Sequence, residues 1–319
     1  MNRHCSLDDS LDRINREINS LLSGVDKTVY DHGRNDFNFM GKAVRSRFTL
    51  LLGDALGLDR AAAERVSVAA ELIHAASLMH DDCIDGSLLR RGLPTLNEKL
   101  GVTTAILMGD LVVSFAFDYA AKITPATPAT LIRAVRAMTE GALLEENLRY
   151  KKISAAETER VMRLKTGELF RWCALTSVCL AKRPELYQAC EIIGTETGVV
   201  FQIVDDVLDF EGEAALTGKD ALKDITGGRA TLPLILAMND KRFSGEIEKD
   251  LTDLKTGSGN GACALRIAGI IKENGFAAGA RELAARKVRA LEAELARLPE
   301  QEAAGVFGNY IFTFSGRLK

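Results

Sequence analysis

The spacing of apolar residues along the chain predicts an all-α protein. Hydrophobic positions recur every three and four residues, which places them on one face of an α-helix. No run alternates apolar and polar residues between turn signals, as a half-buried strand would. Only six prolines occur in 319 residues, so few positions break a helix. The longest predicted helical segments are 59–85, 128–150, 157–181, 184–211 and 277–298.

The breaks between these segments are short and rich in Gly, Pro, Ser and Asn. They lie at 86–95, 122–128, 182–184, 212–229 and 255–261. No long linker or change of composition divides the chain, so we expect a single domain over residues 1–319. The run GSGNGA at 257–262 follows no predicted strand and lacks the basic residue of a phosphate loop, so we interpret it as a connection between helices.

Composition and charge narrow the classes of function. Hydrophobic residues make up 47% of the chain and the net charge is −3, which does not favour a nucleic-acid partner. The N-terminus lacks the pattern of a signal peptide, and no uninterrupted apolar run reaches the roughly eighteen residues of a transmembrane segment. The six cysteines form no CxxC pair and the four histidines no HExxH motif, which disfavours a disulfide framework or a transition-metal site. We therefore predict a cytoplasmic protein without a transmembrane segment.

Two clusters of three aspartates share the spacing i, i+1, i+4. They are Asp81, Asp82 and Asp85 in HDDCID, and Asp205, Asp206 and Asp209 in VDDVLD. On a helix this spacing presents several carboxylates to one side. Each cluster lies near the predicted C-terminal end of a long apolar helix, with Gly86 or Gly212 as a plausible stop, and the helix dipole disfavours negative charge there.

A divalent cation resolves this electrostatic conflict. A solvated helix end is the simpler interpretation of one acidic pair, but it does not account for two matched clusters. Oxygen ligands without nitrogen suit Mg²⁺, which usually takes one or two carboxylates and completes its shell with water and substrate phosphate. The clusters therefore predict Mg²⁺ and a phosphorylated substrate.

Basic residues accompany the acids, as a phosphorylated substrate would require. Guanidinium groups bind phosphate oxygens in pairs, whereas lysine acts as a mobile point charge. Taken singly, each of these cations would most simply be a surface residue. They are Lys42 and Arg45 in GKAVRSR, Arg90 and Arg91 after the first cluster, Lys165 before Thr166 in KTGELF, and Lys219 and Arg229 after the second cluster.

Together these motifs resemble the trans-type polyprenyl diphosphate synthases, with a pattern closest to the bacterial long-chain members. The resemblance covers nearly the whole chain, and two aspartate motifs in order, each with its own cations, are a specific signal. The matching runs are GKxxR at 41–45, IHAASLMHDDCID at 73–85, RRGLPT at 90–95, GD at 109–110, KT at 165–166, FQIVDDVLD at 201–209 and GK to TLP at 218–233.

The resemblance implies a single-domain helical bundle with a deep central cavity, usually a homodimer, in which Mg²⁺ is held by all six aspartates of the two clusters. It also implies two diphosphate sites. The allylic diphosphate would contact or lie beside Arg90, Lys165, Thr166, Gln202, Lys219 and Arg229. Isopentenyl diphosphate would bind without metal against Lys42, Arg45, His74 and Arg91.

The implied reaction fits this division of charges. Breaking the allylic C–O bond produces a carbocation and a diphosphate, and cations that stabilise the departing charge lower the barrier. The isopentenyl double bond attacks the carbocation, and a proton then leaves, for which the departing diphosphate is a reasonable acceptor. An apolar helical cavity would exclude the water that otherwise quenches the carbocation.

The chain departs from the usual GGKRxRP pattern of the family. Met40, Ala43 and Ser46 stand in place of a glycine, an arginine and a proline. Lys42 and Arg45 remain, so the isopentenyl site is expected to persist. Arg229 replaces the usual late lysine and keeps the charge, and Glu145 stands where many members carry glutamine.

Small residues before the first cluster favour a long product, geranylgeranyl or longer. Ala76 and Ser77 lie about one helical turn from the aspartates, where short-chain members often carry an aromatic residue. Alternatively, Ala76 only allows close helix packing, and Phe115 and Phe117 close the channel.

Two other functions remain open at this point. A noncatalytic subunit of a heteromeric synthase would generally lose one or both aspartate motifs, and both are intact. A class I terpene cyclase would not need a second diphosphate site, and its second metal motif normally mixes Asn, Ser or Thr with Glu. The repeated aspartate motif with Lys42, Arg45 and Arg91 disfavours the cyclase.

We expect Ala76→Phe to shorten the product, because the ring would block the channel about one helical turn from the aspartates. Chain-length analysis of the prenyl products of wild type and variant checks this. An unchanged distribution of products would place the floor of the channel elsewhere.

Overall fold

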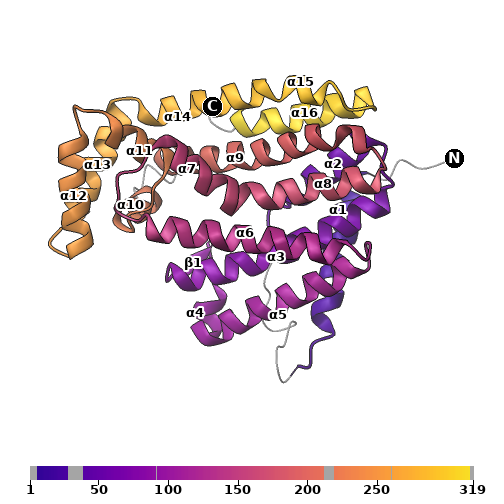
Figure 1. Ribbon diagram of the computed structural model, residues 1–319. Helices are drawn as coiled ribbons and strands as arrows, with labels where there is room; N and C mark the ends of the chain where they lie inside the picture. The colour runs from indigo at the N-terminus through magenta and orange to yellow at the C-terminus, as the bar shows by residue number, and fades with distance from the viewer. Residues whose placement is uncertain (1–5, 28–38, 91, 212–218, 260, 317–319) are drawn as a thin grey trace. The chain divides into compact units, whose positions relative to one another are not determined.

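The computed structural model describes residues 6–27, 39–90, 92–211, 219–259 and 261–316, and these are helical almost throughout (Figure 1). This confirms the predicted all-α fold class. The chain divides into two compact units. Unit 1 comprises residues 1–135, 172–187 and 299–304, and unit 2 comprises 136–171, 188–298 and 305–319. The single domain remains a prediction.

Helix α3 organises unit 1, because α1, α2, α4 and α5 all pack against it. Helix α1 begins with a capping box in which Ser6 and Asp9 each bond the other's backbone N–H, and Asp59 caps α3 through the N–H of Ala62. Six of the seven alanines of α3 are buried, which lets its neighbours approach closely. The elements are α1 (Leu7–Ser23), α2 (Val44–Leu56), α3 (Arg60–Ile84), β1 (Leu89–Arg90), β2 (Leu93–Pro94), α4 (Leu96–Leu100), α5 (Val102–Ala121) and the first part of α6 (Thr127–Asn147).

A glycine on α5 fixes the last turn of α3. A Cβ atom at Gly109 would lie 2.3 Å from Nε2 of His80, so only glycine leaves room for this ring. Nε2 lies 3.1 Å from the carbonyl oxygen of Ile106 and 3.4 Å from Oδ1 of Asp110. The GD pair at 109–110 thus holds the turn that carries the first aspartate cluster.

At the start of α2, one of the residues that depart from the family pattern forms buried hydrogen bonds. Ser46 replaces the proline of the family pattern, and both its N–H and its hydroxyl donate to Oε1 of Glu71, at 2.9 and 2.8 Å. Glu71 on α3 is fully buried. Because proline has no N–H to donate, serine here supplies a carboxylate with partners that proline could not supply.

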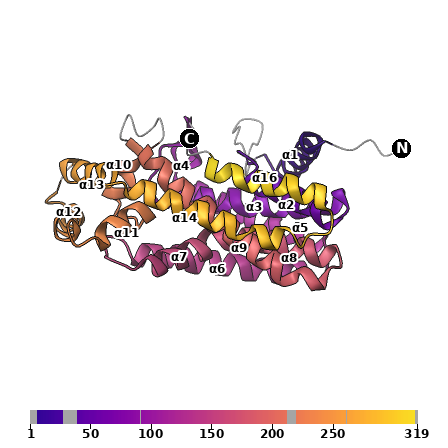
Figure 2. The same cartoon turned by 90° about the horizontal axis from the view of Figure 1, so that it is seen from above.

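Unit 2 contains most of the helices in the second half of the chain. Figure 1 shows α12 and α13 side by side, and Figure 2 shows α10 next to α13. Their buried faces contribute Ile225, Leu251 and Ile267 to a hydrophobic core. The elements, some of which continue into unit 1, are α7 (Ala155–Met162), η1 (Arg163–Gly167), α8 (Glu168–Leu180), η2 (Pro184–Leu186), α9 (Tyr187–Glu211), α10 (Lys219–Thr226), α11 (Leu232–Asn239), α12 (Ser244–Thr256), α13 (Gly261–Glu273), α14 (Phe276–Ala290), α15 (Glu292–Leu295) and α16 (Gln301–Gly316).

Most predicted segments correspond to these helices, and 277–298 is divided into α14 and α15. The segment 157–181 is interrupted by η1, a turn of π-helix, and the break after the first cluster contains a short antiparallel hairpin of β1 and β2. The run at 257–262 connects α12 to α13, as expected, although residue 260 lies outside the described residues. Gly86 follows α3 with a φ of 57°, whereas Gly212 lies outside the described residues.

One described helix, α5, has the length and apolar composition of a membrane span, with a mean hydropathy of 1.4. These two properties are weak evidence, because core helices of globular proteins share them. Its close packing against α3 accounts for the buried part of its surface.

Candidate active site

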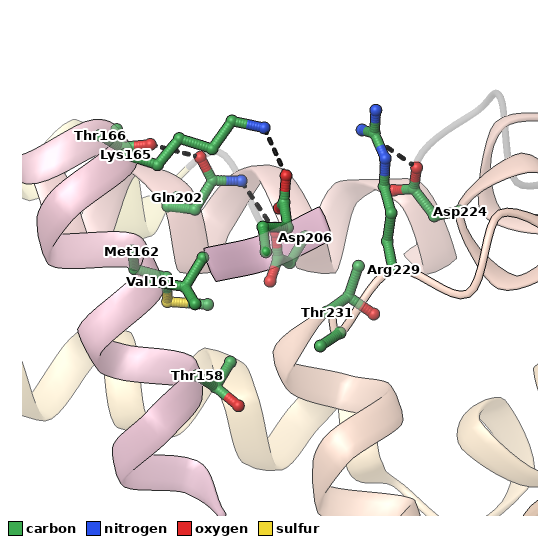
Figure 3. Close-up of a pocket in the computed structure, with 12 residues that line it drawn as sticks. Thr158, Val161, Met162, Lys165, Thr166, Gln202, Asp206, Asp224, Arg229 and Thr231 are labelled. Carbon is green, nitrogen blue, oxygen red and sulfur yellow. Dashed lines mark hydrogen bonds and ion pairs between the residues drawn. The ribbon is translucent and has the colours of Figure 1, made fainter. Parts of the chain in front are cut away.

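Twelve residues of unit 2 line a pocket beside the second aspartate cluster (Figure 3). The pocket has a water-accessible volume of about 60 Å³. The acidic lining residues are Glu145, Asp206 and Asp224, and the basic ones are Lys165 and Arg229. The other lining residues are Thr158, Val161, Met162, Thr166, Gln202, Ala230 and Thr231.

Asp206 on α9 is buried at the centre of this group. Its Oδ1 accepts a hydrogen bond from Nε2 of Gln202, and its Oδ2 accepts one from the backbone N–H of Leu232, both at 2.9 Å. Burial nevertheless raises the pKa of Asp206 to about 8, because two neutral donors do not replace the water that a carboxylate loses. Through its hydrogen bond with Leu232, Asp206 links α9 to the start of α11.

The other members of the second cluster lie along the same helix end. Asp205 is exposed and Asp209 is partly buried. Burial, together with the neighbouring carboxylate of Asp224 on α10, raises the pKa of Asp209 to about 9. Carboxyl groups that retain protons near neutral pH mark a place where negative charge lacks compensation. The donor set is all oxygen, so these residues fit a hard divalent cation.

The basic residues of the pocket are paired with its acids. Nζ of Lys165 lies 2.6 Å from Oε2 of Glu145, and Nη1 of Arg229 lies 3.5 Å from Oδ1 of Asp224 (Figure 3). All four side chains are partly exposed, so an anion that enters the pocket can reach both cations.

A chain of hydrogen bonds links η1 to α9. The hydroxyl of Thr166 donates to Oε1 of Gln202 at 2.8 Å, and the amide of Gln202 donates to Asp206. Thr166 of the KT pair, the glutamine and the central aspartate of the second motif thus form one connected group, as Figure 3 shows.

Tyr150 holds the segment that carries Arg229. Its backbone N–H donates to the carbonyl of Gly228 at 2.8 Å, and its hydroxyl donates to the carbonyl of Thr226 at 2.6 Å. A Cβ atom at Gly228 would lie 2.5 Å from the tyrosine ring, and Gly228 has a φ of 65°. Glycine is therefore required here both for space and for conformation.

The first cluster, in unit 1, shows a similar division between buried and exposed acids. Asp82 is buried and accepts hydrogen bonds from Nε and Nη2 of Arg90, the shortest at 2.7 Å. Asp81 and Asp85 are partly exposed. Arg90, predicted to contact the allylic diphosphate, thus lies where it stabilises the first aspartate motif.

The residues predicted for isopentenyl diphosphate differ in exposure. Lys42 is exposed, Arg45 is buried and His74 on α3 is partly buried. Arg91 lies outside the described residues. Lys219 begins α10, but its side chain is likewise outside what the structure describes.

The pocket brings together five of the predicted site residues, Lys165, Thr166, Gln202, Asp206 and Arg229. It also contains two acids that were not predicted as site residues, Glu145 and Asp224. A sequence signal existed for both, since Glu145 departs from the family pattern and Asp224 stands five residues before Arg229. In the chain-length positions, Ala76 is fully buried, and Ser77 donates its hydroxyl to the carbonyl of His74 at 2.8 Å.

The model of the polyprenyl synthetase family matches residues 27–259 of the chain. The chain belongs to this family. It is 29% identical to octaprenyl diphosphate synthase of Escherichia coli (strain K12) over 244 residues, which cover 72% of this chain and 76% of that protein. It is 31% identical over 261 residues to geranylgeranyl pyrophosphate synthase of Geoglobus acetivorans, which cover 76% of this chain and 81% of that protein.

A solved structure of the same family is similar over its whole length. The polyprenyl synthase of Caulobacter crescentus CB15, complexed with calcium and isoprenyl diphosphate, has a TM-score of 0.78 and 25% identity over 100% of both chains. The comparisons confirm the predicted enzyme class. This family member is a prenyltransferase of isoprenoid synthesis that condenses isopentenyl diphosphate with an allylic diphosphate.

We expect the metal-free synthase to lose stability as the pH rises from 6 to 8. The pKa of Asp206 is about 8 in the folded protein against 3.8 as the ordinary value. The folded state therefore keeps a proton that the unfolded chain has released, and this stabilisation disappears as the pH approaches the folded pKa. Thermal unfolding in a chelator across this range measures the slope.

Asp206→Asn is the matched control, because asparagine does not ionise. Its melting temperature should fall less steeply with pH than that of wild type. Parallel profiles for the two proteins would show that Asp206 does not carry a raised pKa.

Proposed function

We propose that the pocket of unit 2 binds the diphosphate of an allylic substrate together with Mg²⁺, and that the product is geranylgeranyl diphosphate or longer. The observation that carries this proposal is the combination of two carboxyl groups of raised pKa, buried Asp206 and partly buried Asp209, with two cations, Lys165 and Arg229. Acids alone would repel a diphosphate, and cations alone would not account for protonated carboxyls. A metal ion would compensate the carboxylates, and an anionic substrate would pair with the cations.

The proposed metal ligands are the aspartates of both motifs. Asp82 and Asp206 are the buried members, and their oxygens already accept hydrogen bonds from protein groups. We therefore assign them chiefly the task of orienting the helix ends. Asp81, Asp85, Asp205 and Asp209 are the more exposed members and would supply most of the oxygens to the metal. When bound, Mg²⁺ would stabilise the negative charge that builds up on the departing diphosphate.

The cations of the pocket would hold the same diphosphate. Lys165 would leave Glu145 and Arg229 would turn from Asp224 to the substrate oxygens, since both pairs are partly exposed. The hydroxyl of Thr166 can donate to a phosphate oxygen. We propose supporting contacts from Gln202 and Lys219, whereas Arg90 is assigned to Asp82.

The second substrate requires a separate set of cations. We propose that Lys42, Arg45, His74 and Arg91 bind the diphosphate of isopentenyl diphosphate. Because Arg45 is buried, its guanidinium would be held in one orientation and would present a single side to the substrate. The departing diphosphate is the proposed acceptor of the proton that leaves after condensation. We further propose a homodimer in the cytoplasm.

Purified protein with Mg²⁺, labelled isopentenyl diphosphate and, separately, dimethylallyl, geranyl, farnesyl and geranylgeranyl primers tests the proposed function. We expect incorporation and a series of products that ends at one length, geranylgeranyl or beyond. A product no longer than farnesyl would contradict the proposed length. Folded protein that incorporates nothing with any primer would instead favour a noncatalytic subunit.

We expect Asp81→Ala and Asp205→Ala each to abolish turnover while the helical fold persists, because each removes a carboxylate that is at least partly exposed and is proposed to bind metal. Steady-state kinetics and circular dichroism check the two halves of this statement. Asp118→Ala is a control that removes an exposed carboxylate of α5 outside both motifs. Near wild-type activity of either motif variant would refute the metal assignment.

A further inference from the structure

The turn η1, residues Arg163–Gly167, interrupts a long helix with π-helical geometry. A π-turn bonds i to i+5, is wider than an α-turn, and is a rare feature that frequently occurs at functional sites. Here it carries Lys165 and Thr166, the two residues that reach Glu145 and Gln202. Such a turn needs room in the neighbouring helices.

A glycine of α6 provides this room on one side. A Cβ atom at Gly141 would lie 2.6 Å from the backbone nitrogen of Lys165 and 2.7 Å from Cβ of Leu164. Real Cβ atoms do not approach so closely, and the atoms in the way belong to backbone and Cβ, which cannot rotate aside. Any larger residue at this position must displace η1 itself.

A glycine of α9 provides room on another side. A Cβ atom at Gly198 would lie 2.6 Å from Cα of Gly167 and 3.1 Å from its nitrogen. Neither Gly141 nor Gly198 has a positive φ, so backbone conformation does not require glycine at these positions. The close approach of η1 is the requirement.

Each glycine stands four residues before the side chain that η1 contacts. Gly141 precedes Glu145 on α6, and Gly198 precedes Gln202 on α9. Residues i and i+4 lie on the same helix face. On each helix, the face that packs against η1 therefore also carries a hydrogen-bond acceptor, Glu145 on α6 for Lys165 and Gln202 on α9 for Thr166.

We propose that Gly141 and Gly198 are positioning residues for the prenyl transfer reaction. They set how closely η1 lies against α6 and α9, and thereby place Lys165 and Thr166 where the allylic diphosphate binds. This inference rests on the proposed function of the pocket, and extends it to two residues that do not touch the substrate.

The test compares Gly141→Ala and Gly198→Ala with wild type and with Gly269→Ala. Gly269 lies within α13, and a Cβ there would meet nothing within 4 Å. We expect kcat/KM for the allylic primer to fall by about 100-fold in the first two variants, a loss that a 1 Å misplacement can cause. KM for isopentenyl diphosphate should change by less than about threefold, because a binding site elsewhere keeps its geometry. Gly269→Ala should match wild type in both constants.

A double-mutant cycle separates positioning from a loss of stability. If Gly141→Ala acts through Lys165, it should add little to the defect of Lys165→Ala, because the misplaced group is already gone. Direct titration with inorganic pyrophosphate and Mg²⁺ gives a second readout, in which Gly141→Ala should bind as weakly as Lys165→Ala. Circular dichroism and melting temperature verify that each variant is folded.

Three outcomes would overturn the inference. Unchanged kinetic constants in folded Gly141→Ala and Gly198→Ala would show that η1 is not misplaced. Fully additive effects with Lys165→Ala, or loss of the fold in both glycine variants, would show that the glycines serve stability alone. A wild-type protein that neither elongates primers nor binds pyrophosphate would instead refute the proposed function, so the two failures are distinguishable.

Discussion

The burial of one aspartate in each acidic motif is the constraint on which the rest of the site depends. Asp82 and Asp206 lose water at helix ends that already carry partial negative charge. Each carboxyl group can be buried only because other residues donate hydrogen bonds to it. Arg90 donates to Asp82, and Gln202 and the N–H of Leu232 donate to Asp206. These contacts fix the hairpin after α3 and the start of α11. The remaining aspartates of each motif can then face outward.

Much of the fold was predictable because it follows from local pattern. The helical period, the breaks at Gly and Pro and the end of α3 near Gly86 all depend on a few neighbouring residues. The composition of the site was predictable for a different reason. Acids, lysines and arginines in a fixed order indicate a chemistry even when their partners are unknown.

Partners were less predictable, since they depend on residues far apart in sequence. Arg90 is predicted to contact or flank the allylic diphosphate, and the structure adds a partner that the sequence did not indicate, because its guanidinium pairs with Asp82. Glu145 departs from the glutamine of the family pattern, and in the structure it forms an ion pair with Lys165. Ser46 replaces the usual proline of the family, and in the structure its N–H donates a hydrogen bond to buried Glu71. In each case the sequence pattern drew attention to the residue, but its interaction partner depends on how the helices pack.

The π-turn also restricts how this chain can change by insertion and deletion. Its five residues place α7 and α8 in a definite rotational register. Removing one residue would rotate everything that follows by about 100° around the helix axis. Leu169 and Phe170, both fully buried, would then leave their places in the core. This stretch can therefore accept exchanges of side chains over evolutionary time, whereas a gap of a single residue would separate the lysine from the core that supports it.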